Sequence, residues 1–103
     1  SVQRGYLGTA PSLVTGGATG EFVLRSEGDL LFAAGGATSR VRIAGAGNVT
    51  INAPSSGYAL NLPTKTPSSA SDTGTAGDIS WDTSYIYVCT ASNTWKRAAL
   101  STW

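Results

Sequence analysis

The sequence predicts an all-β protein with short strands, glycine-rich turns and a small aromatic-rich β-meander at its end. Its 13 glycines interrupt every window long enough for a helix, and apolar residues alternate with small or polar ones at a period of two. Val, Leu, Ile and Phe make up 20 of the 103 residues, too few for a thick monomeric core. The net charge of +1 is too low for a disordered chain that repels itself. We therefore expect the chain to bury apolar surface against copies of itself.

The first part of the chain contains two predicted hairpins and one further strand. Residues 21–25 and 29–34 alternate around the turn sequence "SEGD", so we expect these two segments to pair. Residues 40–43 and 48–52 alternate around "AGAGN", whose glycines can adopt positive φ, and we expect them to form the second hairpin. Residues 58–62 predict a short strand that the following proline ends.

The chain changes character towards its C-terminal end. A stretch rich in Ser, Thr, Pro and Gly predicts an extended connector that cannot pack a core. After it come all three tryptophans and two of the four tyrosines, and alternation around the turns "DTS" and "SN" predicts a three-stranded meander. We thus expect β-rich, shaft-like modules over 1–63, the connector over 64–77, and an aromatic-rich tip over 78–103.

Side chains of the meander can be assigned to faces because successive residues of a strand point to opposite sides. Tyr85, Tyr87 and Cys89 then share one side of the middle strand, and Trp95 and Arg97 share one side of the last strand. The other side of the middle strand carries apolar residues, so both of its faces are expected to be covered.

Composition and charge exclude several classes of function. Seven Lys and Arg against six Asp and Glu give no basic surface for nucleic acid or anionic lipid. No apolar run approaches the roughly 20 residues of a membrane helix, so we expect no membrane insertion. A chain with no His and one Cys cannot build a Cys/His zinc site or a histidine-based catalytic triad. We expect no cofactor, and we expect Cys89 to be a small buried apolar residue rather than a nucleophile.

Two groups of carboxylates admit both a functional and a structural interpretation. Asp72, Asp78 and Asp82 have a spacing like that of a calcium loop, but the closing glutamate is missing, so we expect turns and no metal. Glu27 and Asp29 have the composition of a glycosidase pair. Nothing near them suggests a deep cleft, so a turn is the favoured interpretation and no catalytic residue is predicted.

Two stretches of the sequence resemble parts of bacteriophage virion proteins. The run from "GYLGTAPSLV" to "GNVTINAP" (5–54) resembles β-structured modules in the distal part of tail fibres and related virion adhesins. The closing run "GTAGDISWDTSYIYVCTASNTWKRAALSTW" (74–103) is similar to a C-terminal segment common in phage structural proteins. The resemblance implies an elongated homotrimer, intertwined or side by side, that belongs to the virion after synthesis in the host cytoplasm.

The same resemblance implies a non-enzymatic, structural and receptor-binding tip of a phage tail fibre. Its partners would be two further copies of the chain, the rest of the tail fibre, and a host cell-surface glycan or protein. Two alternatives stay open. One is a fragment of a tailspike that depolymerises polysaccharide, and the other is a pure trimerisation cap whose receptor contacts are made elsewhere.

The aromatic residues of the tip have two candidate roles. They can form a carbohydrate platform, because C–H faces of sugars pack on aromatic rings, but in a chain this poor in Leu and Ile they are more needed for core and subunit packing. Near a threefold axis each residue meets two copies of itself, so a terminal indole would lock three chains together. We assign trimer packing to Phe22, Phe32, Trp81, Trp95 and Trp103, and receptor or glycan binding to Tyr85, Tyr87, Asn93, Lys96 and Arg97.

Overall fold

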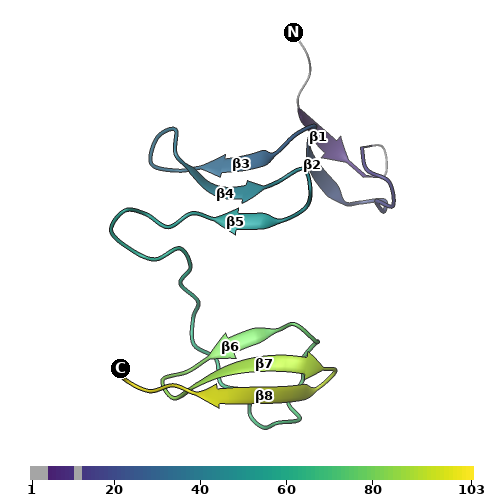
Figure 1. Ribbon diagram of the computed structural model, residues 1–103. Helices are drawn as coiled ribbons and strands as arrows, with labels where there is room; N and C mark the ends of the chain where they lie inside the picture. Colours follow the sequence, from purple (N-terminus) through teal and green to yellow (C-terminus); the bar gives the residue numbers. More distant parts are fainter. Residues whose placement is uncertain (1–4, 11–12) are drawn as a thin grey trace. The chain divides into compact units, whose positions relative to one another are not determined.

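The structure, a computed structural model, describes residues 5–10 and 13–103, and all regular structure within these ranges is β (Figure 1). The predicted all-β class is therefore confirmed. The chain divides into two compact units, Ser1–Asn61 and Leu62–Trp103. In the described part of the chain, no helix is long and apolar enough to cross a membrane.

The first unit contains two antiparallel sheets. In one sheet β1 (Gly5–Thr9) pairs with β2 (Phe22–Ser26), and in the other β4 (Ser39–Ile43) lies between β3 (Leu30–Ala33) and β5 (Val49–Ile51). The expected hairpin across "AGAGN" is confirmed, since β4 and β5 pair directly around that link. Its turn places one glycine in the left-handed region, with φ of 104° at position 47.

Two other predictions for this unit are wrong. Residues 21–25 do not pair with 29–34, because β2 pairs with β1 and β3 pairs with β4. Local alternation says which residues form strands, but it does not choose the partner strand. Residues 58–62 lie outside every strand of the structure, although their sequence alternates.

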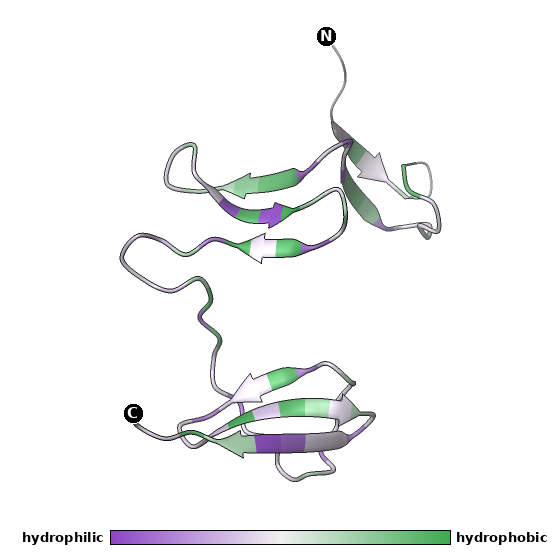
Figure 2. Cartoon of the chain, in the orientation of Figure 1, coloured by the Kyte–Doolittle hydropathy of each residue, from purple (hydrophilic) through white to green (hydrophobic). Residues whose placement is uncertain are grey.

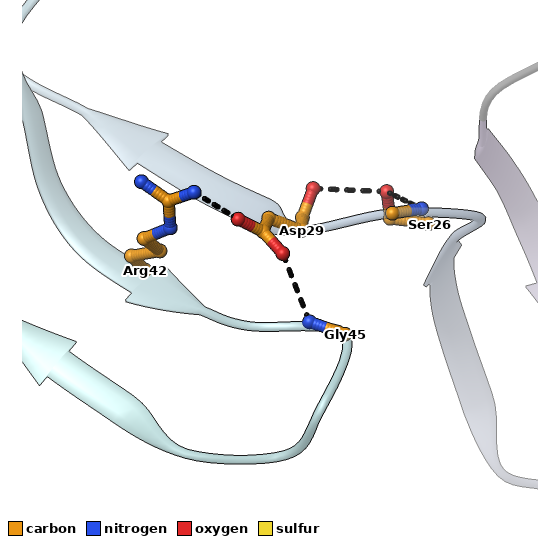
Figure 3. A network of polar contacts seen from close by, with 5 residues as sticks. Ser26, Asp29, Arg42 and Gly45 are labelled. Atoms are coloured by element: carbon orange, nitrogen blue, oxygen red, sulfur yellow. Dashed lines mark hydrogen bonds and ion pairs between the residues drawn. The ribbon is translucent and has the colours of Figure 1, made fainter.

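Polar contacts join the turn between β2 and β3 to β4 and to the turn that follows β4 (Figure 3). Ser26 Oγ donates to the carbonyl oxygen of Asp29 at 3.0 Å. The Asp29 carboxylate accepts from the Gly45 N–H at 2.9 Å and from the Arg42 guanidinium. The Gly45 N–H and then Arg42 lower the pKa of Asp29. Asp29 thus joins the start of β3 to the end of β4.

Each unit buries few of its apolar side chains in this structure. Among the described residues, the buried hydrophobic ones are Ala10, Tyr87 and Cys89, so the expected burial of the single cysteine is confirmed. Figure 2 colours hydrophobic residues green, and many of the green residues in the strands have exposed side chains. The chain exposes 7996 Å², whereas two compact units sharing its 10.5 kDa would together expose about 6,500 Å². One copy therefore leaves more surface in water than a self-sufficient fold of this mass.

The second unit is a three-stranded antiparallel meander of β6 (Ile79–Trp81), β7 (Tyr85–Ala91) and β8 (Thr94–Ala99), in that order. The predicted meander is confirmed. Both predicted turns are also present: the Asp82 carboxylate accepts from two backbone N–H groups of the first turn, and Asn93 adopts a φ of 52° in the second.

Residues 64–77, expected to be an extended connector, lie against this meander, and we call them the covering segment. Beside β6, the Lys65 N–H donates to the Trp81 carbonyl at 3.0 Å; beside β8, the Trp95 N–H donates to the Ala70 carbonyl at 2.9 Å. The small side chains of this segment cannot pack a core, but its backbone still forms hydrogen bonds with both outer strands. Each outer strand is thereby joined to the covering segment by a backbone hydrogen bond.

The indole of Trp95 is the main side-chain contact between the sheet and the covering segment. Its Nε1–H donates to the Asp72 carbonyl at 3.1 Å. A Cβ atom at Gly74 would lie 2.7 Å from Cζ2 of the ring, closer than side chains approach, so the ring requires a glycine there. The Gly74 N–H in turn donates to Oδ1 of Asn93 at 3.1 Å, which ties the segment to the turn between β7 and β8.

We expect Gly74→Ala to destabilise the second unit, by about 1–3 kcal/mol, because the indole cannot yield without breaking its hydrogen bond. The measurement is urea unfolding followed by tryptophan fluorescence, since all three tryptophans belong to this unit. Thr75→Ala, a neighbouring change at an exposed side chain, is the control and should stay within about 0.5 kcal/mol of the parent. Equal stabilities of the two variants would contradict the contact.

Candidate functional site

The sheet of the second unit has two unlike faces, which the strand register defines. Tyr87 pairs with Arg97 and Cys89 pairs with Trp95, so these four side chains share the face under the covering segment. Tyr87 is 5% and Cys89 1% exposed, as expected for a covered face. The predicted common face of Tyr85, Tyr87 and Cys89 is thus confirmed.

Asp82 organises the covered face by accepting four hydrogen bonds. Oδ1 accepts from the N–H groups of Ser84 at 2.8 Å and Tyr85 at 2.9 Å, and Oδ2 accepts from Tyr87 Oη at 2.5 Å and Thr66 Oγ1 at 2.8 Å. The hydrogen bond from Tyr87, followed by that from Ser84, lowers the pKa of Asp82 from 3.8 to about 2. The same contact with Asp82 raises the pKa of Tyr87.

Arg97 is the cation of this face. Its guanidinium lies over the ring of Tyr85, 4.0 Å from the centroid, and the rings of Tyr85 and Tyr87 are 5.9 Å apart. Ion pairs found among the described residues join Arg25 to Glu27 and Arg42 to Asp29, and Arg97 forms none there. A guanidinium held by a ring but lacking a carboxylate partner can bind an anion.

A cleft of about 340 Å³ opens between this face and the covering segment, and we call it the Arg97 cleft. It combines an arginine, a phenol and the edge of an indole with small hydroxyl side chains. Such a surface suits a polyhydroxylated ligand that carries a negative charge. Its lining residues are Thr66, Pro67, Ser68, Ser69, Ala70, Tyr87, Trp95, Lys96 and Arg97.

The five predicted receptor residues are brought together only in part. Tyr87 and Arg97 line the cleft, and Tyr85 supports Arg97 from beside it. Lys96 borders the cleft, but its pairing with Val88 places its side chain on the opposite face of the sheet. Asn93 lies in the turn, where its side chain accepts from the Gly74 N–H.

Residues of the covering segment were not anticipated as site residues. Thr66 and its neighbours up to Ala70 form one wall of the cleft, and Thr66 also binds Asp82. Their composition is typical of a linker. The only sequence signal of a site was a proline, Pro67, between hydroxyl residues.

Within the second unit, the opposite face of the sheet is mostly apolar and partly exposed. Ile79 pairs with Val88 and Trp81 pairs with Ile86, so the four side chains form one patch, which we call the apolar face. Their exposed fractions lie between 36% and 60%. The expectation that both faces of β7 are covered is therefore wrong for a single copy, because the covering segment lies on one side only.

The residues assigned to trimer packing fall into two groups. Phe22, Phe32 and Trp103 are exposed, and Trp81 is partly so while its Nε1–H donates to the Leu62 carbonyl at 2.8 Å. Trp95 packs inside its own chain, against the covering segment.

The carboxylates that were weighed as catalytic or metal-binding groups serve turns and ion pairs. Asp72 accepts from the N–H groups of Ser68 and Thr73, which lower its pKa, and Asp78 accepts from the Thr75 N–H at 2.9 Å. Of the glycosidase-like pair, Glu27 binds Arg25 at 2.7 Å and Asp29 binds Arg42. Within the described ranges, no group of three His, Cys, Asp or Glu side chains is placed to hold a metal ion.

Comparison with known proteins finds two phage proteins with partial similarity. The chain is 45% identical over 47 residues to a capsule K30/K69-specific depolymerase of Klebsiella phage K64-1, a match covering 46% of this chain and 6% of that protein. It is 58% identical over 36 residues to depolymerase 1, also capsule K30/K69-specific, of Klebsiella phage K5-2, covering 35% and 4%. The chain therefore matches a small fraction of the length of these curated relatives. No model of a known protein family and no solved structure matches it.

These comparisons support the resemblance to phage proteins and correct one expectation. Neither relative is named as a tail fibre; both are named as depolymerases, which are enzymes. The expectation of a non-enzymatic protein is therefore overturned. That expectation rests on the resemblance to tail fibres, on the missing histidine and on the lack of a deep cleft near Glu27 and Asp29, and such an argument says nothing of the much longer proteins that match part of this chain.

We expect the stability of the second unit to fall with acid because of Asp82. Its folded-state pKa of about 2 lies below the unfolded value near 3.8, so the carboxylate stabilises the fold fully above about pH 4 and progressively less as pH falls through 2. Urea midpoints measured by tryptophan fluorescence between pH 7 and pH 2 test this. Asp82→Asn should lower the midpoint at pH 7 and flatten the acid slope. An unchanged slope would show that another group is responsible.

Proposed function

We propose that the chain is a segment of a virion-associated phage tail protein that depolymerises capsular polysaccharide. The observation that carries this proposal is the similarity, at 45% and 58% identity, to two capsule depolymerases. In this segment the Arg97 cleft is the surface that we assign to polysaccharide contact. Its arginine, tyrosine and hydroxyl side chains suit a ligand with many hydroxyl groups, and it lies open beside the covering segment.

The proposal predicts cleavage of capsule by the protein that carries this chain. Incubation with purified capsular polysaccharides, including types K30 and K69, should create new reducing ends and shift the polysaccharide to lower mass on size exclusion. Polysaccharide incubated with heat-denatured protein is the control. A panel of capsules that stays intact after long incubation would rule out this function.

We also propose that three copies of the chain assemble through the apolar face. The partly exposed Ile79, Ile86 and Val88 support this, because a contiguous apolar patch in water is stabilised when another surface covers it. The chain also exposes more surface area than two compact units of the same total mass would, which supports burial of surface between copies. The exposed Phe22, Phe32 and Trp103 would add to the contact between copies.

Light scattering tests this assembly, and we expect the chain to have three times its 10.5 kDa mass. Ile86→Asp should give a monomer, because Ile86 pairs with Trp81 and Ala98 and a charge there would be buried among apolar side chains. Thr83→Asp, in the exposed turn before β7, is the matched control and should remain trimeric. Far-UV circular dichroism confirms that each variant is folded, and a monomeric parent chain would exclude the assembly.

A further inference from the structure

A second and larger cleft of the C-terminal unit adjoins the Arg97 cleft. Its volume is about 630 Å³, within the range usual for small-ligand sites, and Pro67 and Trp95 line both clefts. The other walls come from β6 and from the chain that runs beside it. They are formed by Leu62, Pro63, Thr64, Lys65, Asp72, Thr73, Asp78, Ile79, Ser80 and Trp81.

Two indoles are fixed at this larger cleft. The Trp81 Nε1–H donates to the carbonyl of Leu62 at 2.8 Å, and the Trp95 Nε1–H donates to that of Asp72 at 3.1 Å. Both acceptors are themselves lining residues. Aromatic surfaces held in this way lose little conformational entropy when a sugar ring packs on them.

The two clefts differ in charge. Arg97 lines the smaller cleft, and none of the described lining residues is a carboxylate. The nearby Asp82 carboxylate already accepts hydrogen bonds from two lining residues, Tyr87 and Thr66. The larger cleft carries two carboxylates, Asp72 and Asp78, against one ammonium group, that of Lys65. An anion is therefore attracted to the first cleft and repelled from the second, whereas sugar hydroxyl groups can donate to the carboxylates of the second.

We propose that the two clefts are adjoining subsites for one acidic polysaccharide. The Arg97 cleft binds its negatively charged sugar, and the larger cleft, which Trp81 and Trp95 line, binds a neutral sugar of the same chain. This inference rests on the proposed function and adds to it the class of polysaccharide and the position of each kind of sugar.

The charged subsite is tested with two forms of one ligand. Native and carboxyl-reduced capsular polysaccharide of types K30 and K69 are titrated into the full chain by calorimetry. We expect about tenfold tighter binding of the native form, as for a charge-assisted contact, and loss of this preference in Arg97→Gln. Arg97→Lys should restore part of it, and Arg40→Gln, which removes an arginine from the first unit, should leave it unchanged.

The neutral subsite is tested by filling the larger cleft. Thr64 lines it and is exposed, so Thr64→Trp should occupy the space without disturbing the sheet. We expect it to weaken binding of native and carboxyl-reduced polysaccharide by the same factor, about tenfold, while the preference for the native form remains. Thr83→Trp, which adds the same side chain at an exposed turn outside the cleft, should bind as the parent does.

The outcomes separate this inference from the proposed function. Equal affinity for the two forms would overturn the charged subsite, and unchanged affinity of Thr64→Trp would overturn the neutral one. Absence of binding to either form would overturn both subsites. Cleavage by the intact protein is measured independently, so a protein that degrades capsule but shows none of these effects would retain its proposed function and lose the subsites.

Discussion

The C-terminal unit depends on the contact between the covering segment and one face of its three-stranded sheet. A sheet of three short strands has two faces that must be covered and two edges whose backbone groups need partners. Its own side chains cannot cover the faces. The covering segment forms a backbone hydrogen bond with each of the two outer strands. Asp82 and Trp95 then fasten it to the covered face, Asp82 through Thr66 and Trp95 through the Asp72 carbonyl. Loss of either contact would expose Tyr87 and Cys89, the two buried side chains of this unit.

This one-sided cover separates the roles of the two faces. Asp82 fixes polar groups of the covered face, and among the described residues Arg97 has no carboxylate partner, so its guanidinium is open to a ligand. The uncovered face is left with Ile79, Ile86 and Val88 in water, which favours packing against another chain. The Arg97 cleft and the apolar face therefore lie on opposite sides of the same three strands.

The residues of the site were only partly predictable. Alternation places Tyr87 on one face of β7 and Arg97 on one face of β8, but it does not show that these faces coincide. They coincide because the register shifts between Cys89 and Ala91. The same shift pairs Lys96 with Val88, which turns the Lys96 side chain to the other face. The hydroxyl residues of the covering segment carry no signal of a site, since Ser and Thr between prolines are typical of linkers. Their place in the cleft follows from Ala70 and Lys65 bonding to the sheet through backbone atoms.

The sequence by itself determined the all-β class, the meander, its two turns and the burial of Cys89. These features depend on contacts between near neighbours in the chain, so alternation and turn residues specify them. Tertiary structure alone decided that β2 pairs with β1, that β3 pairs with β4, and that the covering segment lies on the sheet. Strand pairing depends on backbone groups, which are chemically alike in nearly every residue, so the sequence does not specify the partner strand. The position of the covering segment depends on the fit of Trp95 against Gly74, two residues far apart in sequence.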